Sequence, residues 1–100
     1  MRKKRVLLNK REIASVLKKH EGWSVNSKET QLSKTYTFSN YIEGLIFIAR
    51  ISVHAEILKH HPDIEFSYGK VKVKLSTHDL KGLTGVDVAL LERIEKLYGK

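Results

Sequence analysis

The sequence has no cysteine, and this absence excludes several classes of protein at once. A chain without thiols forms no disulfide bonds, has no thiolate nucleophile and cannot bind zinc through cysteine. With one proline and six glycines, it does not have the composition of a disordered or low-complexity chain. No apolar run approaches the roughly 20 residues of a membrane-spanning helix. The apolar stretch near the charged N-terminus, Val6-Leu7-Leu8, is too short for a signal peptide, so we expect a cytoplasmic protein.

Acidic residues are also few, with 11 Asp and Glu against 19 Lys and Arg, and the net charge is +8. An excess of this kind is common in proteins that bind nucleic acids, and here it would involve Lys72, Lys74 and the N-terminal run Arg2-Lys3-Lys4-Arg5. The lysines carry no aromatic platform of the kind on which RNA-binding domains stack bases. A lysine-rich surface also simply keeps a protein soluble. A basic nucleic-acid-binding module is therefore the alternative function, and not the favoured one.

The hydrophobic pattern predicts one domain over residues 1–100, of the α+β class. Three capping-box patterns, at Asn9/Glu12, Asn40/Glu43 and Thr84/Asp87, precede apolar residues at helical spacing. They predict helices over about 10–20 and 41–60, and a third helix after Thr84 that carries Val88, Leu91, Ile94 and Leu97. Alternating apolar and polar residues predict strands over 23–26, 31–38, 64–66 and 71–75. The order α-β-β-α-β-β-α indicates two layers, a four-stranded antiparallel sheet with helices packed on one face.

The middle helix is apolar on more than one side. Residues near one stripe are Leu45, Ile48, Ala49, Ser52 and Ala55, and those that broaden it are Ile42, Ile46, Phe47, Ile51 and Leu58. A helix that is apolar nearly all round needs burial on more than one side. We expect one side to pack on the sheet, and a homodimer or homotetramer to form through this helix or through a sheet edge.

Three histidines lie near the ends of predicted elements. His60 and His61 precede the single proline, Pro62, and His78 follows the last predicted strand. Adjacent residues of a helix point about 100° apart, so the pair has poor geometry for a metal, and we expect no metal site. An imidazole can donate or accept a proton near neutral pH, which accelerates a reaction by about 10² to 10⁴. Spacing alone does not decide between proton transfer and the simpler role of ending a helix or strand.

Residues 55–90 read AEILKHHPDIEFSYGKVKVKLSTHDLKGLTGVDVAL. This run combines the triplet His60-His61-Pro62 with the later pair Thr77-His78, the triplet Gly82-Leu83-Thr84 and Asp87. The combination resembles the signature of the pterin-4a-carbinolamine dehydratases. The similarity extends through the pair Gly22-Trp23 to the first predicted helix, over roughly residues 7–97.

Members of that family dehydrate 4a-hydroxytetrahydropterins to quinonoid dihydropterins, without metal or organic cofactor. The resemblance implies that His60 and His78 are the principal acid and base, in either order, while His61 holds and polarises the pterin. It implies pterin-site roles for a further set of residues, Trp23, Glu56, Pro62, Thr77 and Asp87. A core anchor explains Trp23 nearly as well, and a helix cap explains Asp87. The family further implies recycling of the pterin cofactor of a hydroxylase.

Overall fold

The structure is a computed structural model that describes residues 5–99. Within this range, the helices are α1 (Lys10–Lys19), α2 (Tyr41–Leu58) and α3 (Gly85–Leu97). The strands are β1 (Ser24–Val25), β2 (Leu32–Thr37), β3 (Asp63–Ser67) and β4 (Lys70–Leu75), and a short 3₁₀ helix, η1 (His78–Leu80), follows β4. The predicted order of helices and strands is confirmed. The sequence pattern does not predict η1, which is a single turn with no periodicity of its own.

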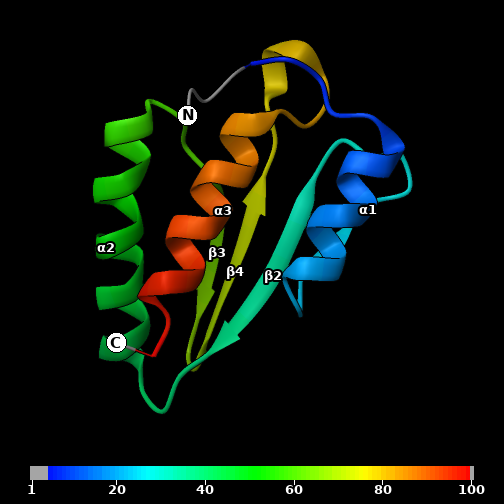
Figure 1. Ribbon diagram of the computed structural model, residues 1–100. Coiled ribbons are helices and arrows are strands. Elements are labelled where there is room, and N and C mark those ends of the chain that lie inside the picture. The colour runs from blue at the N-terminus through cyan, green and yellow to red at the C-terminus, as the bar shows by residue number, and fades with distance from the viewer. Residues whose placement is uncertain (1–4, 100) are drawn as a thin grey trace.

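The strands form one antiparallel sheet in the order β1-β2-β4-β3, and the helices cover one of its faces (Figure 1). Alternation along β4 decides which face is covered. Val71, Val73 and Leu75 are buried beneath the helices, whereas the intervening lysines lie on the opposite face. On that face Lys72 stands directly across from Glu65 of β3 and Thr35 of β2. The predicted two-layer α+β architecture is therefore confirmed.

The starts of the helices follow the sequence closely. Both predicted capping boxes at the starts of α1 and α3 are present. The one predicted at the start of α2 is only half formed. Asn40 Oδ1 accepts from the backbone N–H of Glu43 at 2.9 Å, but the Glu43 carboxylate accepts from Ser39 rather than from Asn40. The carboxylate reaches one residue further back, so the reciprocal bond of a capping box is absent there.

The side of α2 that packs on the sheet draws on both groups of apolar residues named from the sequence. Its buried residues are Gly44, Phe47, Ile51 and Ala55. Of the stripe residues named from the sequence, Leu45, Ala49 and Ser52 are exposed, whereas Ala55 is buried. The helix is apolar nearly all round, and its periodicity therefore does not single out the face that packs on the sheet. Gly44 belongs to the inner face because a Cβ there would lie 2.8 Å from the Phe66 ring.

The outer side of α2 carries a row of exposed apolar side chains. We call this set the α2 stripe; its members are between 46% and 60% exposed and comprise Ile42, Leu45, Ile46, Val53 and Ile57. Ile42 is followed by Leu45 and Ile46 at three and four positions, Val53 lies seven positions after Ile46, and Ile57 four after Val53, so they share one side of the helix. Within residues 5–99, no helix combines the length and the apolar character needed to cross a membrane.

Candidate active site

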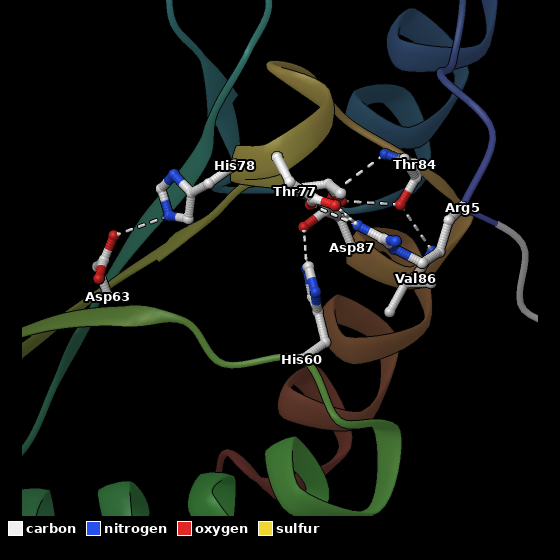
Figure 2. Close-up of polar contacts among 9 residues, drawn as sticks. Arg5, His60, Asp63, Thr77, His78, Thr84, Val86 and Asp87 are labelled. Atoms are coloured by element: carbon white, nitrogen blue, oxygen red, sulfur yellow. Dashed lines mark hydrogen bonds and ion pairs between the residues drawn. The ribbon is translucent and has the colours of Figure 1, made fainter.

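The histidines lie at the end of the molecule where α2 finishes and α3 begins (Figure 2). Helix α2 stops at Leu58, two residues before the predicted end, because Lys59 adopts the left-handed conformation with φ of 53°. The chain turns there, and the backbone N–H of His60 donates to Ala55 O at 3.0 Å. His60 therefore stands just beyond the helix, with its side chain directed toward the first turn of α3.

A buried carboxylate holds His60. Its Nε2 atom lies 2.6 Å from Oδ1 of Asp87, and the two side chains are 13% and 0% exposed. The other oxygen, Oδ2, accepts from the Thr77 hydroxyl at 2.7 Å and from the backbone N–H of Thr84 at 2.9 Å. The Thr84 hydroxyl in turn lies 2.9 Å from that of Thr77 (Figure 2). His60, Asp87, Thr77 and Thr84 thus form one hydrogen-bonded network, the His60 network.

The geometry of the His60 network fixes how the imidazole can act. Both donors to Oδ2 leave Oδ1 as an acceptor, so the N–H at His60 Nε2 donates to it. Nδ1 is then the ring nitrogen that remains for exchange of a proton with another molecule. Asp87 and Thr77 have almost no exposed surface. Any influence they have on a bound molecule therefore passes through His60.

His61 belongs to a separate and exposed pair. Its Nε2 atom lies 2.5 Å from Oε2 of Glu56, and the two side chains are 62% and 76% exposed. Glu56 lies in the last turn of α2, so it reaches the histidine that follows the helix end. Pro62, the next residue, leads directly into β3 at Asp63.

His78 opens η1, and its ring is directed toward β3 (Figure 2). Nε2 of His78 lies 3.4 Å from Oδ2 of Asp63, and the histidine is 68% exposed. The turn that carries His78 is held at its base, where Thr77 N–H donates to Gly82 O at 2.8 Å. His78 is therefore an exposed group on an anchored turn, in contrast to the largely buried His60.

The N-terminal segment adds a charged contact beside His78. Arg5 donates to both carboxylate oxygens of Asp79. These hydrogen bonds, with the charge of Arg5, hold the pKa of Asp79 below its usual value. Sequence reasoning missed Arg5, Asp63 and Asp79 as neighbours of the histidines. The two aspartates look like ordinary strand and turn residues, and the partner of Arg5 lies 74 positions away.

The structure does not bring Trp23 into the His60 network. Its side chain is 6% exposed and packs in the core, and Nε1 donates to Glu95 Oε2 at 3.1 Å. Lys34 and Tyr36 bind the same carboxylate oxygen. Burial raises the pKa of Glu95, but the hydrogen bonds from these three side chains outweigh it and lower the pKa overall. Burial beside Glu95 likewise raises the pKa of Tyr36.

The basic residues named for the alternative function have local partners where the structure describes them. Lys74 forms an ion pair with Glu65 and lowers the pKa of that carboxyl, and Lys72 lies across the sheet from the same residue. Of the N-terminal run, Arg5 binds Asp79, whereas residues 2–4 lie outside the described residues. These contacts do not favour nucleic-acid binding.

The described residues contain no group of three or more His, Asp or Glu side chains placed to hold a metal ion. The His60 network and the two exposed pairs, His61 with Glu56 and His78 with Asp63, present imidazole and carboxylate groups that can donate and accept protons.

Comparisons with known proteins agree with the motif in the sequence. The model of the family described as pterin 4 alpha carbinolamine dehydratase matches residues 6–97. A Nostoc punctiforme protein provisionally named pterin-4-alpha-carbinolamine dehydratase is 41% identical over 91 residues, which cover 91% of this chain and 96% of that protein.

Solved structures show the same fold. The crystal structure of a transcriptional coactivator/pterin dehydratase from Brucella melitensis superposes with a TM-score of 0.89 at 26% identity, over 94% of this chain and 100% of that one. A pterin dehydratase-like protein identified as a RuBisCO assembly factor in the alpha-carboxysome gives a TM-score of 0.68 at 24% identity. It covers 81% of this chain and 94% of its own, and at that identity the likeness concerns the fold alone.

Proposed function

The chain belongs to the pterin 4 alpha carbinolamine dehydratase family, and we propose that it dehydrates 4a-hydroxytetrahydropterin by histidine acid–base catalysis. In this reaction the C4a–O bond breaks and N5 loses its proton. The products are one quinonoid dihydropterin and one water molecule. The enzyme must therefore supply a proton to the departing hydroxyl and remove one from N5.

The observation that carries the proposal is the contact between His60 and the buried Asp87, 2.6 Å apart. A carboxylate that fixes one ring nitrogen orients the imidazole and sets which nitrogen carries the proton. A general acid or base needs orientation of this kind, because it must lie within hydrogen-bonding reach of the proton before its pKa matters. In our proposal Nδ1 of His60 exchanges the proton with the pterin, and Asp87 and Thr77 are positioning residues.

We assign the second proton-transfer step to His78. Its exposed ring, 3.4 Å from Asp63, is accessible to a substrate that lies against the same end of the molecule. His60 and His78 then act on two neighbouring atoms of the pterin, the oxygen on C4a and the hydrogen on N5. One histidine donates a proton to the departing hydroxyl, and the other accepts the proton from N5. Transfer of a proton from the second histidine to the first through water then restores the starting protonation state of both.

The remaining residues of the site have binding roles in this proposal. His61, oriented by Glu56 at 2.5 Å, binds and polarises the pterin. Pro62 restricts the backbone conformation of the chain at His61. Trp23 stays a predicted pterin contact, although its indole is bonded to Glu95 within the core. No metal takes part in any step, and the physiological role that we propose is recycling of an oxidised pterin cofactor.

We also propose that the chain works as a homodimer or homotetramer. The α2 stripe exposes five large apolar side chains on one side of a helix, and burial of such a surface stabilises an association.

A direct assay tests the proposed activity. Freshly generated 4a-hydroxytetrahydropterin is mixed with the protein, and its dehydration is followed by ultraviolet absorbance. We expect a rate above the spontaneous one that scales with protein concentration and is unchanged after treatment with EDTA. A rate equal to that of the buffer would contradict the activity. Loss of the rate with EDTA and its return with zinc would contradict the metal-free mechanism.

A further inference from the structure

A cavity of about 440 Å³ lies between α2 and α3, away from the His60 network. The two helices run side by side in opposite directions (Figure 1), and residues of both line the cavity. Its lining residues are His54 from α2 and Ala89, Glu92, Arg93, Lys96 and Leu97 from α3. Arg93 lies roughly 9 Å along α3 from Asp87, given a rise of about 1.5 Å per residue. We call this feature the α2–α3 groove.

An unusual pairing spans the α2–α3 groove. Arg93 Nη1 lies 3.1 Å from Nδ1 of His54, and both side chains are partly buried. A guanidinium keeps its charge and can only donate, so His54 accepts at Nδ1 and carries its own proton on Nε2. One imidazole nitrogen accepts a single hydrogen bond, whereas a guanidinium has five N–H groups. Most of the hydrogen-bonding capacity of Arg93 is therefore not used by His54.

The charges around the α2–α3 groove are predominantly positive. Within residues 5–99, the ion pairs of α3 involve Asp87, Glu92 and Glu95, and none involves Arg93 or Lys96. Glu92 is the one acidic residue that lines the cavity, and its Oε2 lies 3.8 Å from Nε2 of His20 on α1. A partly buried guanidinium without a carboxylate partner favours binding of an anion from solution.

We propose that the α2–α3 groove binds a phosphate-type oxyanion. The planar guanidinium of Arg93 matches two oxygens of a tetrahedral phosphate, and Lys96 adds a second positive charge beside it. His54, whose Nε2–H is set by its contact with Arg93, supplies a further donor. His54, Arg93 and Lys96 line the same cavity, so donors from two helices are available to one phosphate group. It is separate from the pterin chemistry and does not depend on it.

Titration of the full-length protein with inorganic phosphate, at constant ionic strength set by sodium chloride, tests the proposal. Two-dimensional ¹H–¹⁵N NMR spectra report the site, and we expect saturable shifts concentrated at the amides of residues 53–55 and 89–97. Arg93→Gln should weaken binding by about tenfold or more, because it removes a charge-assisted hydrogen bond. Arg11→Gln, the same substitution at an exposed position of α1, is the matched control and should leave the affinity unchanged.

Lys96→Gln gives a second test at an exposed position, where misfolding is not expected, and should also weaken binding. Sodium acetate at equal ionic strength separates a phosphate site from a general anion site. Non-saturating shifts spread over the lysines of the sheet, or equal affinities for Arg93→Gln and Arg11→Gln, would overturn the proposal. Equal binding of acetate and phosphate would overturn the assignment of the ligand as phosphate.

Discussion

Asp87 holds His60 with one carboxylate oxygen and the start of α3 with the other. The same side chain is therefore both a helix cap and the anchor of the proposed acid–base residue. In the sequence these two readings of Asp87 compete, because the pattern Thr84-x-x-Asp87 is already explained by capping. In the structure both roles hold together, because Oδ1 binds His60 and Oδ2 binds the start of α3. The carboxylate is fully buried, with 0% exposure.

Asp87→Asn should lower kcat by about 10² or more and change KM less, because the amide cannot accept at both positions and so disturbs the His60 tautomer. The amide oxygen still accepts from Thr84 N–H, so we expect the variant to fold. Steady-state kinetics measure the effect, and circular dichroism checks the fold. Asp63→Asn, at an exposed acid beside His78, is the matched control and should have a smaller effect. A folded Asp87→Asn enzyme with kcat near that of the wild type would remove Asp87 from the mechanism.

Glu95 should make stability depend on pH in the acid range. Its folded pKa is lower than the ordinary value of 4.5, so its stabilising effect is complete above that value. The effect is lost as the pH falls through the lowered folded pKa, because protonation disrupts the bonds from Lys34, Tyr36 and Trp23. The free energy of unfolding, measured with urea between pH 7 and pH 3, should therefore fall with decreasing pH more steeply in the wild type than in Glu95→Gln. Glu92→Gln, one turn earlier on the exposed side of α3, is the control and should keep the pH dependence of the wild type. Equal pH dependence of the free energy of unfolding in the wild type and in Glu95→Gln would contradict the role of Glu95.

Sequence reasoning succeeded where local patterns decide the structure. Alternation in Val71, Val73 and Leu75 predicts which side of β4 is buried, and the capping residues predict where α1 and α3 begin. It did not identify the inner face of α2, because apolar residues surround the helix and only tertiary packing selects one side. It also gave no sign that Lys59 would take the left-handed conformation and end α2 early.

The candidate site was predicted only as a set of residues. The motif selected His60, His61, His78 and Asp87, but pairing across the fold is not encoded in spacing. Contacts such as His60 with Asp87, 27 positions apart, require the chain to be folded before they can be seen. Thr84 was recognised as a cap, and its hydroxyl contact with Thr77 was missed for the same reason.

The α2 stripe should mediate self-association. We expect a dimer or tetramer at micromolar concentration, since the stripe is apolar and exposed on the isolated chain. Val53→Glu places a charge in the middle of the stripe and should shift the protein toward an 11.5 kDa species in sedimentation velocity. Ser27→Glu, the same kind of added charge at an exposed position between β1 and β2, is the control and should leave the association unchanged. A wild-type protein that sediments only as the monomer would refute self-association.

Kinetics of the three single histidine variants test the acid–base account most directly. His60→Ala and His78→Ala should each lower kcat by about 10² or more, and His61→Ala should mainly raise KM. The double variant His60→Ala/His78→Ala should lose less than the product of the single losses, because both residues act on one transition state. Three small and similar changes that follow thermal stability would instead indicate that the histidines only end their helix and strand. Near-wild-type kcat in both His60→Ala and His78→Ala, measured on folded protein, would contradict the account.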